Sequence, residues 1–268
     1  MARRRDIPVR EFAARTHGNR QHLRALVIGL VAGMGGGLVS LGGGSLIVPL
    51  LTGWAGLDQL DARGTALAVS IVSALTGTIV YARAGEIDWR IVVWTGLVAM
   101  IVAPLAVRFS AGWSTRVLKL AFGVVVTIGG AILIAKSVFP MHGFATAWPI
   151  PFLALTGGIT GLVAGVVGVS GGPVLTPLFV FGLAVPQQLA QGCSLAARLP
   201  SSLSGSWQNW RQRNIELAML PGLAAGAIAG GVAGGHLALA LPSGALRLVF
   251  GAALMLLGIA YMRGGRRT

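Results

Sequence analysis

Hydrophobic residues fill most of this chain in long runs, and short polar segments separate the runs. Four such runs occupy the first half, at residues 25–57, 64–82, 91–107 and 117–134. Apolar runs of about 18 or more residues are typical of helices that cross a membrane. The pattern therefore predicts an all-α integral membrane protein built as a polytopic helical bundle.

The first run is too long for one straight helix. It extends from Ala25 to Leu57 without a charged residue, which would give a helix of roughly 50 Å across a hydrocarbon core of about 30 Å. Three consecutive glycines, Gly42 to Gly44, interrupt the run, and glycine is the costliest residue for a helix after proline. We therefore predict that the first segment is broken at this glycine motif.

The glycine motif returns later in the chain, and the spacing of its two copies holds for most of the sequence. Pro49 and Pro177 close the two copies and lie 128 positions apart. At the same offset a set of further identical or similar residues coincides: Gly29/Gly157, Gly33/Gly161, Gly37/Gly165, Gly43/Gly171, Gly44/Gly172, Gln59/Gln187, Gly64/Gly192, Gly77/Gly205, Arg83/Arg211 and Phe122/Phe250. This agreement predicts an internal duplication, as in many secondary transporters.

The duplication divides the chain into two membrane repeats with four apolar segments each, about eight in total. We place a basic cytoplasmic tail at 1–24, repeat 1 at 25–136, a linker at 137–149, repeat 2 at 150–262 and a second basic tail at 263–268. If every segment crosses the membrane, the repeats are parallel, and this is the arrangement that we favour. If the broken segment is a re-entrant hairpin, three spans remain per half and the repeats are inverted. Both arrangements leave the two termini on one side.

Composition and charge support a membrane location. The chain is 54% hydrophobic and only 10% charged, with a net charge of +14, whereas soluble domains carry roughly 25% charged residues. Much of the positive charge lies in the two tails, where the positive-inside rule predicts cytoplasmic ends. We therefore expect a multi-pass protein of the bacterial inner membrane with both termini in the cytoplasm, and no nucleic-acid partner.

Irregular backbone inside a membrane needs cover from protein or from a water-filled cavity. A helix that restarts after a break also directs amide groups and a positive dipole end toward such a site, which suits an anion. Arg198 adds a cation in the middle of an otherwise uncharged segment, and no acidic residue lies within the apolar segments. An intramembrane arginine normally faces a cavity or a partner, and its planar donors suit a small oxyanion.

The predicted substrate-binding residues are those of the two helix restarts and the polar residues around Arg198. They are Gly42, Gly43, Gly44, Ser45, Thr65, Ser170, Gly171, Gly172, Cys193, Ser194 and Arg198. For the spaced glycines of the first segments, such as Gly29, Gly33 and Gly37, we prefer close helix packing to a role in binding. No paired carboxylates, metal-ligand cluster or nucleophile–base pair occurs, so we expect neither an enzyme nor a cofactor or metal.

The ordered motifs resemble the sulfite exporter TauE/SafE family of membrane permeases. The resemblance rests on Gly43-Gly44-x-x-x-x-Pro49-Leu50, on Gly64-Thr65-Ala66-Leu67, on Asp88-Trp89-Arg90 and on the copies of the first two motifs in the second half. It implies movement of sulfite, sulfonates or related sulfur-containing anions across the inner membrane. The chain departs from the family pattern at Cys193, Tyr81, Asn209 and Arg198, which affects the substrate.

We therefore predict a permease whose partners are a small anionic substrate and the lipid bilayer; formation of a homo-oligomer is left open. Two alternatives remain. One is a permease for another small anion, such as a carboxylate. The other is a non-transporting membrane scaffold in which the glycines serve packing alone.

Overall fold

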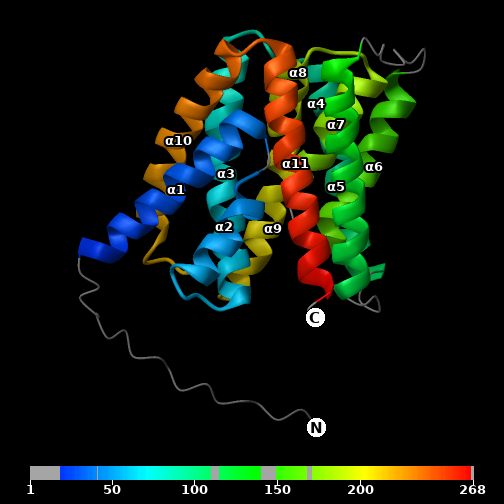
Figure 1. The fold of residues 1–268 in the computed structure, drawn as a ribbon. Helices are drawn as coiled ribbons and strands as arrows, with labels where there is room; N and C mark the ends of the chain where they lie inside the picture. The colour runs from blue at the N-terminus through cyan, green and yellow to red at the C-terminus, as the bar shows by residue number, and fades with distance from the viewer. Residues whose placement is uncertain (1–18, 41, 110–114, 140–148, 168–170, 267–268) are drawn as a thin grey trace.

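The computed structural model describes residues 19–40, 42–109, 115–139, 149–167 and 171–266, and these are helical with no strand among them. Figure 1 shows the helices as one bundle. In chain order they are α1 (Asn19–Val39), α2 (Gly42–Gly53), α3 (Gln59–Arg83), α4 (Trp89–Phe109), α5 (Thr115–Val138), α6 (Pro149–Val167), α7 (Gly172–Gly182), α8 (Gln187–Ala197), α9 (Leu199–Arg211), α10 (Leu220–Ala240) and α11 (Ser243–Arg266).

The first apolar region folds back on itself as a helical hairpin. Leu51, near the end of α2, packs in one cluster with Ala25 and Ile28 from the beginning of α1, so the two helices are antiparallel. The chain turns at Ser40, whose φ of 43° is left-handed and costs a residue with a side chain roughly 1–2 kcal/mol. The break therefore precedes the glycine triplet, and Gly42 to Gly44 form the first turn of α2 instead of the break itself.

The corresponding region of the second half has the same shape. The Phe152 ring near the start of α6 lies against Gly182 at the end of α7, and Thr160 lies against Gly171 at the start of α7. These contacts make α6 and α7 antiparallel. Both broken segments are thus hairpins whose tips point into the bundle, and neither is a single crossing helix.

Helices at equivalent positions of the two halves run in opposite directions. Gly77 of α3 contacts Leu195 of α8, whereas Leu67 of α3 lies 3.7 Å from the site of a Cβ on Gly205 of α9. Leu195 is the equivalent of Leu67 at the 128-residue offset, and Gly205 is the equivalent of Gly77. The two contacts are therefore the same leucine–glycine pair with the two halves exchanged. The two contacts together make α3 antiparallel to α8 and α9.

Helices α5 and α11 repeat this arrangement. A Cβ on Gly123 would lie 2.8 Å from the Gly258 carbonyl oxygen, and one on Gly130 would lie 2.7 Å from that of Gly251. These two contacts are again exchanged at the 128-residue offset, and they make the helices antiparallel. The parallel arrangement that we favoured from the sequence is therefore wrong for these helices, and the inverted alternative agrees with the contacts.

The spaced glycines pack helix against helix, as predicted. Gly29 and Gly33 of α1 lie against the backbone of Leu223 and Ala227 in α10. Gly157 and Gly161 of α6 lie in the same way against Thr95 and Ala99 of α4, with carbonyl oxygens 2.6 and 2.7 Å from the position of a Cβ. The first helix of each half therefore packs on a helix of the other half.

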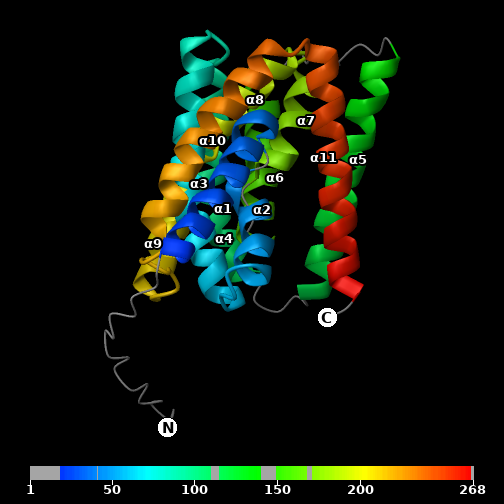
Figure 2. The same ribbon diagram turned by 60° about the vertical axis from the view of Figure 1, so that its left-hand side comes forward.

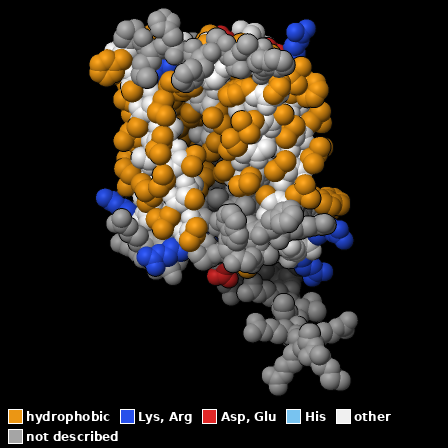
Figure 3. Space-filling model, turned by 90° about the vertical axis from the view of Figure 1, so that its right-hand side faces the viewer, with side chains coloured by type: hydrophobic (Ala, Val, Ile, Leu, Met, Phe, Trp, Pro, Cys, Tyr) orange, Lys and Arg blue, Asp and Glu red, His pale blue; other side chains and the backbone are white. Residues whose placement is uncertain are grey.

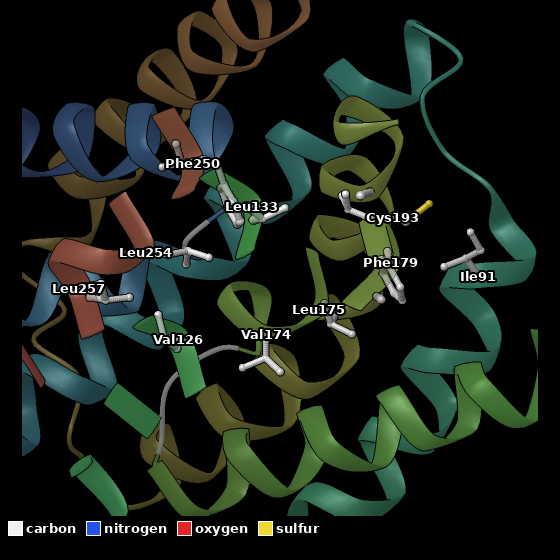
Figure 4. Packing of buried hydrophobic residues seen from close by; sticks show 14 of the residues in the cluster. Ile91, Val126, Leu133, Val174, Leu175, Phe179, Cys193, Phe250, Leu254 and Leu257 are labelled. Carbon is white, nitrogen blue, oxygen red and sulfur yellow. The ribbon is translucent and has the colours of Figure 1, made fainter. Parts of the chain in front are cut away.

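The surface and the core fit a lipid environment. Five helices of the described part are long and apolar enough to cross a membrane, and Figure 3 shows hydrophobic side chains over the middle of one face with Lys and Arg toward its ends. The largest core cluster joins α5, α7, α8 and α11 through residues such as Leu133, Leu175, Cys193 and Phe250 (Figure 4). Apolar side chains thus cover this face of the bundle and also fill its interior.

The connections lie at two opposite ends of the bundle. The start of α1 and the end of α11 lie at one end together with the α9–α10 connection, whereas the α3–α4 connection lies at the other (Figures 1 and 2). A parallel arrangement would have placed the two connections at the same end. Their separation is the property that distinguishes the two topologies in an experiment.

We expect cysteines at positions 84 and 212 to react with a membrane-impermeant maleimide from opposite sides of the membrane. Ala84 and Gln212 are exposed residues of the two connections, and a Cys193→Ser background removes the natural thiol. Labelling in right-side-out and inside-out vesicles measures the sidedness of each position. Labelling of both positions from one side would contradict the inverted arrangement.

Candidate functional site

The tips of the two hairpins meet inside the bundle. A side chain on Gly172, the first residue of α7, would collide with the carbonyl oxygen of Ser40 at the end of α1. It would also lie 3.2 Å from Nη1 of Arg198. Only glycine at position 172 therefore lets the end of α1, the start of α7 and Arg198 approach so closely. This close approach explains the glycine independently of any role in breaking a helix.

Arg198 lies between the two tips because the helix that carries it is interrupted. It stands between α8 and α9, two residues before Pro200, which cannot donate a hydrogen bond to the carbonyl of Ala196. Its side chain is 1% exposed, and Nη1 donates a hydrogen bond of 3.3 Å to the Ser40 carbonyl. The guanidinium thus lies at the negative end of the α1 dipole, which helps to offset the cost of burying it.

Two hydroxyl groups extend this polar centre. Ser194 lies one helical turn before Arg198 on α8, and its Oγ is 3.4 Å from the Ser40 Oγ. The Ser194 hydroxyl also lies 3.4 Å from the carbonyl oxygen of Gly172, to which it donates. The end of α1, the start of α7 and the end of α8 are therefore connected by one set of polar contacts. Its members are Ser40, Gly172, Ser194 and Arg198.

Gln191 and Tyr81 belong to the same centre, although neither is among the substrate-binding residues predicted from the sequence. The Tyr81 hydroxyl lies 2.7 Å from Oε1 of Gln191 and 3.2 Å from the Gly37 carbonyl oxygen. Both side chains are fully buried. Gln191, Ser194 and Arg198 follow a spacing of three and four residues, which places them on one helix face. This polar stripe is the sequence signal that would have identified Gln191.

The start of α7 offers groups that suit an anion. Gly171 is the N-cap residue and Gly172 the first helical residue. Pro173 has no N–H, and the N–H groups of Val174 and Leu175 donate to the Gly171 carbonyl oxygen, so the Gly172 N–H is the amide of this first turn that can face a ligand. The Thr160 methyl group lies against Gly171, and the buried Thr160 hydroxyl has no hydrogen-bond partner among the described residues. A positive dipole end, the Arg198 guanidinium and the Ser194 hydroxyl thus lie near one another around Gly172.

Thr65 and Cys193 lie elsewhere and anchor connections instead. The Thr65 Oγ1 accepts a hydrogen bond of 2.9 Å from the backbone N–H of Glu216. The Cys193 Sγ accepts one of 3.2 Å from the N–H of Asp88. Asp88 and Glu216 are also 128 positions apart, so the two halves exchange the same contact. These two predicted residues are therefore not brought to the polar centre.

The remaining predicted residues are described only in part. Gly42, Gly43, Gly44 and Ser45 form the first turn of α2, and their side-chain surroundings lie outside what the structure describes. Ser170 lies outside the described residues altogether. Of the eleven residues predicted, the structure places Gly171, Gly172, Ser194 and Arg198 together.

Among the described residues, the polar side chains of this centre are not repeated 128 positions earlier. Ala66 corresponds to Ser194 and Ala32 to Thr160, and both alanines are buried. Ser70 corresponds to Arg198, and its hydroxyl donates to the carbonyl of Leu67 in its own helix at 2.8 Å. The described residues thus form one such centre, contributed mainly by the second half. No three His, Cys, Asp or Glu residues of the described part lie together as metal ligands.

Comparisons with known proteins agree with this architecture. The family model described as "Sulfite exporter TauE/SafE" matches residues 1–148 and 153–268. A probable membrane transporter protein of Methanocaldococcus jannaschii is 28% identical over 57% of this chain, and the alignment spans 59% of that relative. The probable membrane transporter protein YunE of Bacillus subtilis is 24% identical over 74% of this chain and 82% of its own length.

No solved structure matches the chain. The family model, in contrast, covers both halves of the sequence and nearly every described residue. The chain belongs to the sulfite exporter TauE/SafE family.

Proposed function

We propose that the protein is a membrane permease for a small oxyanion, which binds where the tips of the two hairpins meet. The observation that carries the proposal is the buried Arg198 guanidinium, which lies between Ser40 at the end of α1 and Gly172 at the start of α7. A cation, a helix N-terminus and hydroxyl groups form the donor set that recognises oxyanions. An intramembrane charge that faces such a junction marks a substrate pathway.

We propose sulfite, a sulfonate or a similar sulfur oxyanion as the substrate. A guanidinium presents two parallel N–H groups to two oxygens of one ligand, and the Gly172 N–H at the start of α7 would donate to a third oxygen. The family name supports sulfur anions. A carboxylate has two oxygens only and would leave the Gly172 N–H without a partner, which is costly in a buried site.

The proposed transport mechanism follows from the arrangement of the helices. We propose that residues 25–136 and 150–262 are two copies related by an axis in the membrane plane, because their equivalent contacts are exchanged between α3 and α8–α9 and between α5 and α11. In a protein with inverted repeats, each half can adopt the conformation of the other. This exchange converts a state open to one side of the membrane into a state open to the opposite side. The hairpin tips lie at the interface that such a motion would alternately expose.

We propose that the termini lie in the cytoplasm of a bacterium and that the bundle spans the inner membrane. The starts of α3 and α5 and the α9–α10 connection lie near the end that carries the termini (Figure 1). These segments hold Arg63, Arg116, Arg211 and Arg213. Arg83, Arg90, Lys136 and Arg247 lie toward the opposite end. Together with the basic tails, the first set gives the excess of positive charge that marks the cytoplasmic side.

Flux measurements in proteoliposomes test this function. We expect the protein to move sulfite and methanesulfonate faster than acetate, because methanesulfonate and acetate share a methyl group and differ in their charged group. Protein-free liposomes give the background rate. Equal rates for methanesulfonate and acetate would assign the protein to the broader class of anion permeases, and background rates for all three would favour the non-transporting alternative.

A further inference from the structure

Two cations lie side by side away from the hairpin tips, at the end of the bundle opposite to the termini. Lys136 stands in the last turn of α5, and Arg247 lies in the second turn of α11. Nη1 of Arg247 donates a hydrogen bond of 3.3 Å to the Lys136 carbonyl oxygen. Both side chains are partly buried. Two adjacent cations in a partly buried position need a compensating charge.

The protein supplies little of that compensation. Nζ of Lys136 donates to the Val180 carbonyl at 2.9 Å and lies 4.8 Å from the centre of the Phe181 ring. Nε of Arg247 is buried and has no hydrogen-bond partner among the described residues. Neither cation forms an ion pair in the part of the chain that the structure describes. The start of α11 adds its positive dipole end, which makes Arg247 unfavourable there without an anion.

The surface beside the cations is apolar and faces outward. Ile132 lies one helical turn from Lys136 on α5, and Leu248 and Val249 follow Arg247 on α11; all three are exposed. An amphiphilic ligand could thus place a negative headgroup on the cations and its acyl chains along α5 and α11. Free anions would use the cations alone and would leave the apolar surface uncovered.

We infer that Lys136 and Arg247 bind the phosphate of an anionic phospholipid whose acyl chains lie along α5 and α11. Each Lys or Arg near an anionic headgroup contributes about 1 kcal/mol, a factor of about five in affinity. Removal of both cations should therefore weaken binding of the lipid by roughly 30-fold. The site is distinct from the hairpin tips and does not depend on which substrate the protein moves.

Native mass spectrometry of the purified full-length protein tests the site with phosphatidylglycerol and phosphatidylcholine of the same acyl chains. We expect wild-type protein to retain phosphatidylglycerol preferentially and Lys136→Gln/Arg247→Gln to lose this preference. The matched control is Arg83→Gln/Arg90→Gln, which removes two exposed cations from the same end and should keep it. Lys136→Arg/Arg247→Lys keeps both charges and should also keep the preference if the first double variant does not fold.

Three outcomes would overturn the inference. The first is equal retention of the two lipids by wild-type protein. The second is the same loss of preference in the Arg83/Arg90 control, which would show a general effect of charge. The third is displacement of phosphatidylglycerol by millimolar inorganic phosphate, which would assign the cations to a free anion instead of a lipid.

Discussion

Replacement of Arg198 by alanine is expected to lower sulfite flux in proteoliposomes by roughly 10- to 150-fold. A hydrogen bond to a charged group contributes about 1.5–3 kcal/mol, which corresponds to this range. The guanidinium is the cation found where the two hairpin tips meet, and it lies beside the glycine that begins α7. Arg198→Lys keeps the charge without the planar pair of donors, and we expect an intermediate flux from it.

Ser70→Ala is the matched control because Ser70 is the residue 128 positions before Arg198 and bonds only within its own helix. It should leave flux near the wild-type rate. Arg198 also caps the end of α1 through Ser40, so the amount of folded protein must be measured by size-exclusion chromatography for each variant. If folded Arg198→Ala protein transported sulfite at the wild-type rate, the arginine would have no part in transport. Its role would then be limited to the hydrogen bond that caps the end of α1.

The sequence predicts the helical content and the breaks because both follow from local chemistry. Apolar runs longer than a bilayer must bend, and consecutive glycines indicate where bending is cheap. The position of the turn is less well determined: it falls at Ser40, just before the glycines. A left-handed serine is not apparent from composition, since it is held in place by its partners Arg198 and Ser194.

The direction of the second half could not be derived from residue patterns. A hairpin and a crossing helix of the same length have nearly the same apolar sequence. With a hairpin, however, each half crosses the membrane an odd number of times, and the repeats become inverted instead of parallel. Contacts between distant residues decide the matter, such as Gly77 with Leu195 and Gly123 with Gly258. Thr65 and Cys193 lie away from the polar centre for a related reason. They align with each other and are polar, but each faces a connection of the other half.

The difference between the two halves bears on how many anions bind. The sequences match best at the glycines, where backbones pack, and differ at the polar centre, where Ser194 and Arg198 replace Ala66 and Ser70. Packing contacts are thus shared by both halves, whereas the groups that we propose to bind the anion come mainly from one. We therefore expect one anion per chain and not one per half.

Gly33→Ala is expected to destabilise the protein by about 1–3 kcal/mol, the usual cost of overpacking a well-packed core. A Cβ on Gly33 would lie 2.8 Å from the Cα and 2.9 Å from the carbonyl carbon of Ala227 in α10. Both atoms belong to the backbone, so α1 and α10 would have to separate. The midpoint of thermal unfolding in detergent measures the effect, and we expect a clear decrease.

Gly158→Ala provides the comparison, because Gly158 lies in a helix as well, but no atom outside its own stretch of helix backbone lies within 4 Å of the position of its Cβ. Alanine is a better helix former than glycine by about 0.8–1.0 kcal/mol, so this variant should unfold at or above the wild-type midpoint. Gly161→Ala should fall between the two, since its Cβ would lie 2.7 Å from the Ala99 carbonyl oxygen and 3.0 Å from the Ala99 Cα and Val102 Cβ. Equal midpoints for all three variants would show that α1 does not pack on α10, nor α6 on α4, as closely as the structure places them, and the exchanged packing of the two halves would then be wrong.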